Sequence, residues 1–191
     1  MPVEIDVDQR LAAIADATLE IVAAQGIDGV TIRAVAKRIG GSTTLVTNYL
    51  PNREALLRNA VEHAIRSWDK DLRAAIEGVI AEERLFAAVH WASSTVGNDQ
   101  VLRKLFMELL GRGEPGSGTI HVIRQDTRRI QESLREAADE ARAPDSAFTA
   151  DIVTLVLRGF YLCSLEDPER WTSERMTPLV ERLLRLLVPG P

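Results

Sequence analysis

Residues 31–53 place two glycines between two short segments with helical patterning, and this arrangement constrains the fold more than any other feature. The stretch reads TIRAVAKRIGGSTTLVTNYLPNR, with Gly40-Gly41 at its centre. Glycine accepts positive φ without a Cβ penalty, so the pair predicts a tight turn. Thr31 and Ser42 stand where N-cap residues belong, one before each short helix. The pattern therefore predicts a helix–turn–helix unit.

The second short segment carries small hydrogen-bonding side chains that we expect to be exposed. They are Ser42, Thr43, Thr44, Thr47, Asn48 and Tyr49. Two helices this short rarely serve only as core, and small polar groups on the second one suit the major groove of DNA. The sequence therefore predicts that this segment binds DNA.

The distribution of charge agrees with this interpretation, although the net charge of the chain is −5. Residues 1–29 carry −5, residues 30–58 carry +4, and residues 59–191 carry −4. A basic segment inside an acidic chain is typical of a protein that touches nucleic acid with one small face. Surface charge that is merely scattered is the alternative explanation.

Helical periodicity continues through the rest of the chain, and no alternating strand pattern is convincing. Helices are expected at residues 8–25, 31–39, 42–49, 54–78, 82–95, 99–110, 119–141, 147–165 and 173–188. The predicted fold is thus all-α, with about nine helices. We place a helix–turn–helix DNA-binding domain at residues 1–52 and a helical body at residues 53–191.

The last two helices are apolar on two faces, and each face must be covered. In residues 147–165 one face holds Ile152, Leu155, Val156 and Gly159, and the other holds Val153, Leu157, Phe160 and Tyr161. One face can pack on the body while the other meets a second copy, which predicts a homodimer with a four-helix seam. The interface residues predicted are Val153, Leu157, Phe160, Leu179, Leu183, Leu186 and Leu187. Burial by the chain's own helices is the alternative.

Residues 10–57 resemble the N-terminal DNA-binding domain of TetR-type (TetR/AcrR) transcriptional regulators. The matching positions are Arg10, Ile14, Ala17, Leu19, Ile21, Gly26, Thr31, Arg33, Val35, Ala36, Gly40, Ser42, Tyr49, Leu50, Pro51, Arg53, Glu54 and Leu56. Three positions depart from the family pattern. Gly41 replaces a small aliphatic residue, Thr47 replaces an aromatic residue, and Leu45-Val46 is more apolar than usual.

The resemblance implies a role for each DNA-binding candidate. Thr31 would bind a backbone phosphate, and Arg33 would contact a base, with guanine as the expected partner. Ser42, Thr43 and Thr44 would meet base edges or thymine methyl groups. At the flank, the expected phosphate contacts come from Asn48, Tyr49 and Arg53, while Thr47 is a further candidate.

The resemblance also implies that the body holds a small-molecule pocket coupled to the DNA-binding domain, with Trp68 near the hinge. The candidate lining residues are Trp68, Phe86, His90, Trp91, Phe106, Met107, His121, Arg124 and Tyr161. Apolar walls with a few polar groups are usual in ligand pockets. For any single one of these residues, plain core packing is the alternative.

Other classes of protein have little support in the sequence. Residues 111–116 match G-x-G-x-x-G, but no strand precedes them and Pro115 interrupts them, so a dinucleotide site is not expected. No catalytic constellation, metal cluster or cofactor site is expected. No membrane-spanning segment or secretory signal is predicted, and the single cysteine favours a cytoplasmic protein.

These observations predict a non-enzymatic transcriptional regulator that binds double-stranded DNA. The expected form is a homodimeric repressor that binds a palindromic operator and is released by an unidentified small-molecule ligand. A ligand-responsive activator is one alternative. The other is an all-helical ligand-binding protein, or an enzyme, in which the DNA-binding domain is weakened or incidental.

Overall fold

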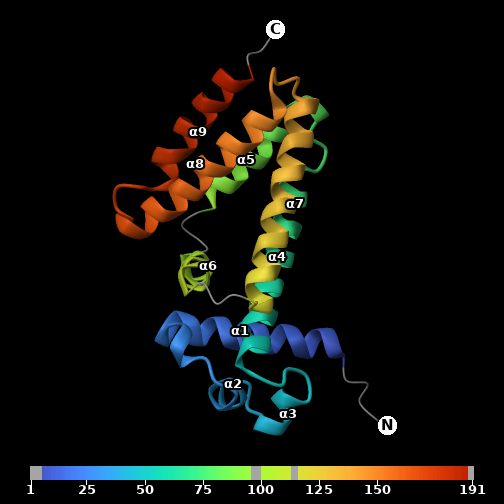
Figure 1. Cartoon of the computed structure of the whole chain (residues 1–191), viewed down its shortest axis with the longest axis vertical. Coiled ribbons are helices and arrows are strands. Elements are labelled where there is room, and N and C mark those ends of the chain that lie inside the picture. The colour runs from blue at the N-terminus through green and yellow to red at the C-terminus, as the bar shows by residue number, and fades with distance from the viewer. Residues whose placement is uncertain (1–5, 96–99, 113–115, 189–191) are drawn as a thin grey trace. The chain divides into compact units, whose positions relative to one another are not determined.

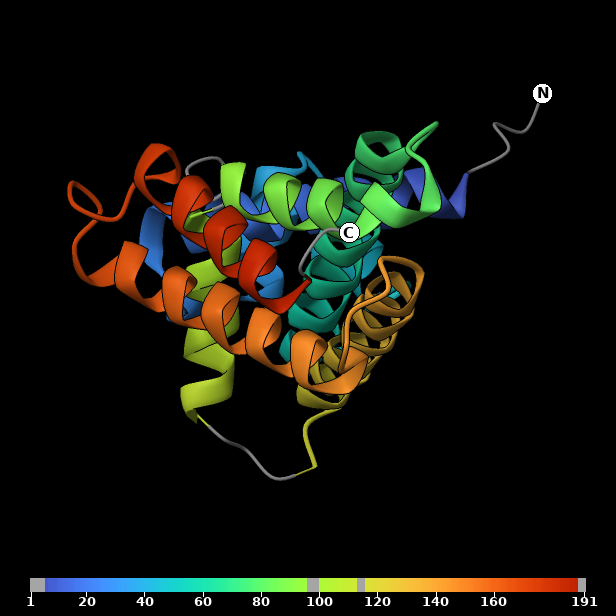
Figure 2. The same ribbon diagram turned by 90° about the horizontal axis from the view of Figure 1, so that it is seen from above.

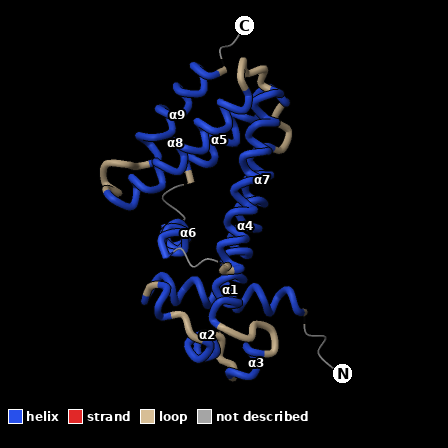
Figure 3. The backbone as a smooth tube through the Cα atoms, viewed as in Figure 1, coloured by secondary structure: helices blue, strands red, loops and turns tan. Residues whose placement is uncertain are grey.

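The structure is a computed structural model that describes residues 6–95, 100–112 and 116–188, and these residues form an all-helical fold without strands (Figure 3). The helices are α1 (Val7–Gln25), η1 (Ile27–Gly29), α2 (Ile32–Arg38), α3 (Thr43–Thr47), α4 (Arg53–Ile76), η2 (Ala81–Glu83), α5 (Arg84–Ser94), α6 (Gln100–Arg112), α7 (Gly118–Glu140), α8 (Ser146–Glu166) and α9 (Ser173–Leu187). The predicted fold class is confirmed. Gly111 and Arg112 still belong to α6, so this helix ends later than the expected residue 110, and its expected first residue, Asp99, lies outside the described residues.

The described residues form two compact units (Figure 1). The first unit takes the described residues of Met1–Ser67 and Val101–Gln125, and the second takes those of Trp68–Gln100 and Asp126–Pro191. Helices α4 and α7 contribute residues to both units. The predicted domain boundary after residue 52 marks the end of the DNA-binding motif, whereas these two units are defined by contacts in space. The units therefore do not test that boundary, which stays a prediction.

The first unit is built on α1, whose inner face is buried against α2 and the start of α4. Ile14 and Ala15 of α1, Val35 of α2 and Leu56 of α4 are fully buried. Asn59 of α4 donates a hydrogen bond to the carbonyl of Leu11 at 2.8 Å. This packing supports α2 and α3, which are only 7 and 5 residues long.

The second unit is organised around α9, which packs against both α5 and α8 (Figure 2). Its core combines α5, the second part of α7, α8 and α9, and includes Leu85, Val89, Val153, Phe160 and Leu184. The pairing explains why the sequence of α8 and α9 is rich in apolar residues. One face of each helix is covered by the chain's own neighbours.

This packing places the predicted dimer-interface residues differently, and the interface itself stays a prediction. Val153, Leu157 and Phe160 are buried in the chain's own core, because the face that carries them meets α5 and α9. Leu183 and Leu187 are half-buried, whereas Leu179 and Leu186 keep 51% and 74% of their surface exposed. The exposed apolar residues of α8 are instead Phe148, Leu155 and Leu162, which are 53%, 66% and 49% exposed.

Among the described residues, α8 is the one helix long and apolar enough to cross a membrane by length and composition. The core helix of a soluble protein passes the same test, and α8 contributes Val153, Leu157 and Phe160 to a packed core. Only 33% of its apolar window is buried among the described residues.

Candidate nucleic-acid interface

Both short helices begin at the residues that the sequence indicates. The Thr31 hydroxyl oxygen accepts a hydrogen bond from the Ala34 amide at 3.0 Å, and the Ser42 hydroxyl oxygen accepts one from the Leu45 amide at 3.1 Å. Each cap satisfies an amide that has no partner inside the helix. The predicted starts of α2 and α3 are therefore confirmed.

The turn between α2 and α3 depends on Gly40 for its geometry. Gly40 has a φ of +67°, in the left-handed region that favours glycine. The Gly41 amide then donates to the Ala36 carbonyl at 2.9 Å, which closes the end of α2. A Cβ atom placed on Gly41 would lie 3.5 Å from the nearest Leu45 carbon and 3.6 Å from Ile39. There is thus room at Gly41 for the small side chain that the family pattern leads one to expect.

Most predicted DNA-contacting residues are exposed. Thr31, Arg33, Ser42, Thr43, Thr44, Thr47, Asn48 and Arg53 are exposed, and Tyr49 is half-buried. Val46 is fully buried and anchors α3 on the unit, so its apolar side chain faces inward and not toward DNA. The Thr47 hydroxyl donates to the Thr44 carbonyl at 3.3 Å. DNA contact by these residues stays a prediction.

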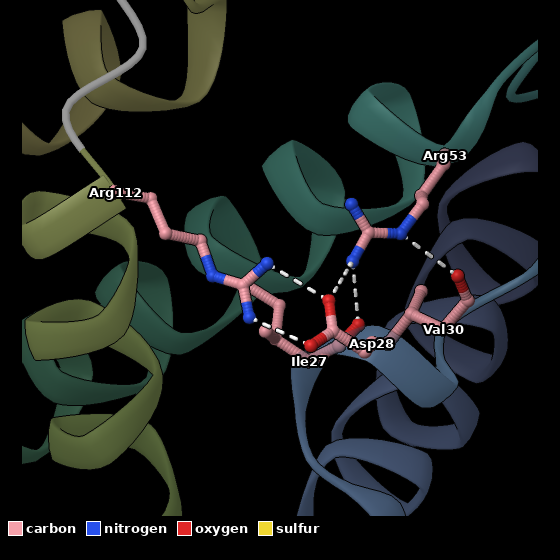
Figure 4. Close-up of polar contacts among 5 residues, drawn as sticks. All are labelled: Ile27, Asp28, Val30, Arg53 and Arg112. Atoms are coloured by element: carbon pink, nitrogen blue, oxygen red, sulfur yellow. Dashed lines mark hydrogen bonds and ion pairs between the residues drawn. The ribbon is translucent and has the colours of Figure 1, made fainter.

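Arg53 has a second role that the sequence reading missed. Its Nε donates to the Val30 carbonyl at 3.0 Å, and its Nη2 donates to the Ile27 carbonyl at 2.7 Å (Figure 4). Nη2 also lies 3.6 Å from the Asp28 carboxylate. The guanidinium therefore fixes the loop that leads into α2. Any contribution of Arg53 to DNA binding thus includes its effect on the position of this loop.

Asp28 is held from the other side by Arg112, the last residue of α6. The two guanidinium nitrogens of Arg112 lie 2.8 and 2.9 Å from the two carboxylate oxygens of Asp28, a bidentate pair (Figure 4). Arg112, through this hydrogen bond and its charge, and Arg53, through its charge, lower the pKa of Asp28 from its ordinary value of 3.8, against the opposing effect of burial. No sequence signal predicts this pair, because its partners lie 84 positions apart.

The candidate ligand-binding residues fall into both units. Trp68, Phe86, His90, Trp91 and Tyr161 belong to the second unit, and Phe106, Met107, His121 and Arg124 belong to the first. Phe86 and Tyr161 pack against the core of the second unit, and Phe106 is buried in the first. His121 and Arg124 are exposed. A pocket that these residues share stays a prediction.

Two polar contacts in the second unit bear on that prediction. His90 Nδ1 lies 2.9 Å from Glu181 on α9, so this histidine has a partner within the unit. Arg158 of α8, which the sequence reading did not select, donates to the Thr127 hydroxyl of α7 at 2.9 Å. Within the described residues, no group of three or more His, Cys, Asp or Glu side chains is placed to hold a metal ion.

Comparison with known proteins assigns the helix–turn–helix segment to a family. Residues 14–60 match the family described as bacterial regulatory proteins, tetR family. The chain is 28% identical over 160 residues to the HTH-type transcriptional regulator BetI of Burkholderia thailandensis, a match that covers 78% of this chain and 81% of that protein.

Solved structures with the same fold cover nearly the whole chain. A transcriptional regulator from Rhodococcus sp. Rha1 superposes with a TM-score of 0.81 at 17% identity, covering 94% of this chain and 96% of that one. A transcriptional regulator from Saccharomonospora viridis in complex with choline gives a TM-score of 0.81 at 14% identity, covering 93% and 96%. At these identities the structural matches establish the fold of the chain.

Proposed function

The chain belongs to the tetR family of bacterial regulatory proteins, and from this premise we propose that it is a dimeric repressor of a palindromic operator. The observation that carries the proposal is the exposed polar surface of α2 and α3. Arg33 on α2 and Thr43 and Thr44 on α3 are all exposed. A short helix with small polar side chains fits the major groove, where base edges present donors and acceptors.

The dimer is proposed to form through the outer faces of α8 and α9. Leu155 and Leu162 of α8 and Leu179 and Leu186 of α9 are exposed apolar side chains that a second copy would cover. A two-fold axis brings the same patch of both copies together, so each residue contributes twice. Two DNA-binding domains related by that axis would contact two half-sites of a palindrome.

Release from DNA is proposed to follow binding of a small molecule in the helical body. The Saccharomonospora viridis regulator with the same fold binds choline, which supports a small-molecule ligand for this chain without naming it. A ligand changes DNA affinity only by as much as it favours one conformation over another. We place the protein in the cytoplasm, where its DNA lies, and assign it a binding role without catalysis.

The experiment that tests this function is selection from a pool of random DNA duplexes with the full-length protein at moderate salt. A palindromic consensus with two equal half-sites is expected. The matched control is the double variant Thr43→Ala with Thr44→Ala, which leaves α3 folded but removes its exposed groups. This variant should abolish enrichment. Failure of the folded wild-type protein to enrich any sequence would contradict the proposed function.

A further inference from the structure

One flank of α8 carries an arginine that is bound to an uncharged partner. Arg158 is half-buried, and its Nη2 donates to the hydroxyl oxygen of Thr127 on α7 at 2.9 Å. Among the described residues, Arg158 forms no ion pair with a carboxylate. A charge that has lost part of its hydration and meets no opposite charge costs free energy. This flank of α8 therefore favours the binding of an anion.

The nearest acid in the sequence of α7 binds another arginine and not Arg158. Asp126, directly before Thr127, is buried and accepts a hydrogen bond from Arg129 at 2.7 Å. The same nitrogen of Arg129 donates to Asp69 on α4 at 2.6 Å. Arg129 thus joins α4 to α7 within the second unit through two charged partners. Arg158 differs from Arg129, because its contact with a neutral hydroxyl leaves its charge available to a ligand.

A second polar group on this flank is buried without a hydrogen-bond partner. Thr154 precedes Arg158 by four residues, so the two side chains lie on the same flank of α8. The Thr154 hydroxyl oxygen is buried and forms no hydrogen bond within the described part of the chain. On the same helix, the Thr149 hydroxyl donates to the Asp145 carbonyl at 2.8 Å. A buried hydroxyl without a partner costs free energy, so Thr154 offers a donor to a ligand that binds at Arg158.

Side chains with large apolar parts continue this flank beyond Arg158. Tyr161 and Leu165 follow at steps of three and four residues, and both are half-buried. Tyr161 packs against the core of the second unit. One guanidinium and one hydroxyl suit a single negative charge, whereas the apolar neighbours suit an apolar body. The flank thus fits a small molecule that has both.

We propose that Arg158 and Thr154 bind the carboxylate of a small monocarboxylate whose apolar part lies along Tyr161. The inference rests on the proposed function, because it names the chemical class of the small molecule that the helical body binds. The planar guanidinium pairs with both carboxylate oxygens, and the Thr154 hydroxyl donates to one of them. Nη2 of Arg158 keeps its contact with Thr127.

The first test compares small molecules that are similar in shape and differ in charge. Benzoate and hexanoate are titrated into the full-length protein by calorimetry, each beside its neutral amide, with benzylamine as the cationic counterpart of benzoate. At least one carboxylate should bind, and its amide should bind about tenfold more weakly or worse, because the charge-assisted contact is lost. Benzylamine should not bind. Absence of binding by both carboxylates, or equal affinity of each carboxylate and its amide, would rule out the site.

Variants of the second unit locate the bound carboxylate. Arg158→Met removes the charge but keeps an unbranched side chain, and it should weaken carboxylate binding about tenfold or more. Thr154→Val has nearly the same shape as wild type and should weaken binding roughly two- to tenfold. Arg135→Met is the matched control, because it removes an exposed cation from α7 in the same unit, and it should leave the affinity unchanged. Carboxylate binding that survives Arg158→Met would overturn the proposal.

A separate measurement needs no ligand. Urea unfolding of the unliganded Thr154→Val protein should give a higher midpoint than wild type, because a buried hydroxyl without a partner is removed. Thr149→Val is the matched control on the same helix and should lower the midpoint, because its hydroxyl is hydrogen-bonded. A lower midpoint for Thr154→Val would show that this hydroxyl serves the fold, against its assignment to a ligand.

Operator binding separates this inference from the proposed function. Carboxylate binding at Arg158, in a protein whose operator complex does not respond to the carboxylate, would support the site and contradict the proposed release. Selection of a palindromic operator by a protein that binds neither carboxylate would support DNA binding and overturn the site. Loss of the dimer in Arg158→Met, measured by sedimentation, would assign the charge of Arg158 to a second copy and also overturn the site.

Discussion

At the scale of single residues, two exposed arginines of the DNA-binding segment have different surroundings. Arg33 is exposed on α2, whereas Arg53 is bound to two backbone carbonyls. We therefore expect Arg33→Ala to relax base preference at one operator position, at a cost of about 1–3 kcal/mol for the preferred base. Selection from random duplexes with the variant checks this.

Arg53→Ala is the companion variant, and it should weaken binding to all sequences alike. It removes a positive charge and also frees the loop that leads into α2. Arg53→Lys keeps the charge but cannot hold both carbonyls with a planar fork, so it should recover only part of the affinity. A uniform loss from Arg33→Ala as well would contradict its assignment as the base-contacting residue.

Asp28 gives the protein a defined response to acid. The pKa of Asp28 is lowered from 3.8, first by the hydrogen bond from Arg112. The pair therefore stabilises the folded state at pH values above 3.8, and this contribution is lost as the pH falls through the lowered pKa. The urea midpoints of wild type and Asp28→Asn should differ by a constant amount from about pH 7 to about pH 5 and converge below the ordinary Asp value. A difference between the two urea midpoints that persists in acid would mean that the charge of Asp28 does not contribute to stability.

At the scale of elements, cap residues and breakers made the helices predictable. Thr31 and Ser42 each accept a hydrogen bond from an amide of the helix that follows, as their types and positions indicated, and Asp145 does the same at the start of α8. The covered face of α8 was not predictable, because both faces are apolar and periodicity cannot say which one the chain itself covers. The Asp28–Arg112 and Glu54–Gly118 contacts were hidden for another reason: they join residues far apart in the sequence.

The turn between α2 and α3 provides a paired test of backbone conformation. Gly41→Ala should stabilise the fold by about 0.4–1 kcal/mol, because the new methyl group meets Ile39 and Leu45 at ordinary contact distances and the unfolded chain loses freedom. Gly40→Ala should destabilise it by about 1–2 kcal/mol, because its φ is +67°. Urea unfolding of both variants measures the difference, and equal effects would contradict this account of the turn.

At the scale of the whole molecule, the proposed dimer depends on the outer face of α8. Leu155→Glu should raise the dimer dissociation constant about a hundredfold or more, because a leucine burial of at least about 1.5 kcal/mol is lost twice across a two-fold interface. Ile80→Glu is the matched control, since Ile80 is also an exposed apolar residue, at 61%, but lies outside α8 and α9. Sedimentation at micromolar concentration distinguishes the two variants. A Leu155→Glu protein that remains dimeric would show that the interface does not include the outer face of α8.

The composition of α3 has a consequence for reprogramming the regulator. Its five residues, Thr43–Thr47, carry no charge, while the nearby cations Arg33 and Lys37 belong to α2. Counterion release, which makes adhesion to any DNA depend on salt, comes from cations and not from threonines. Exchanging Thr43, Thr44 and Thr47 should thus change which operator is preferred while the salt slope stays constant. Specificity and general affinity become separately adjustable, which is what a set of mutually orthogonal regulators built on one scaffold requires.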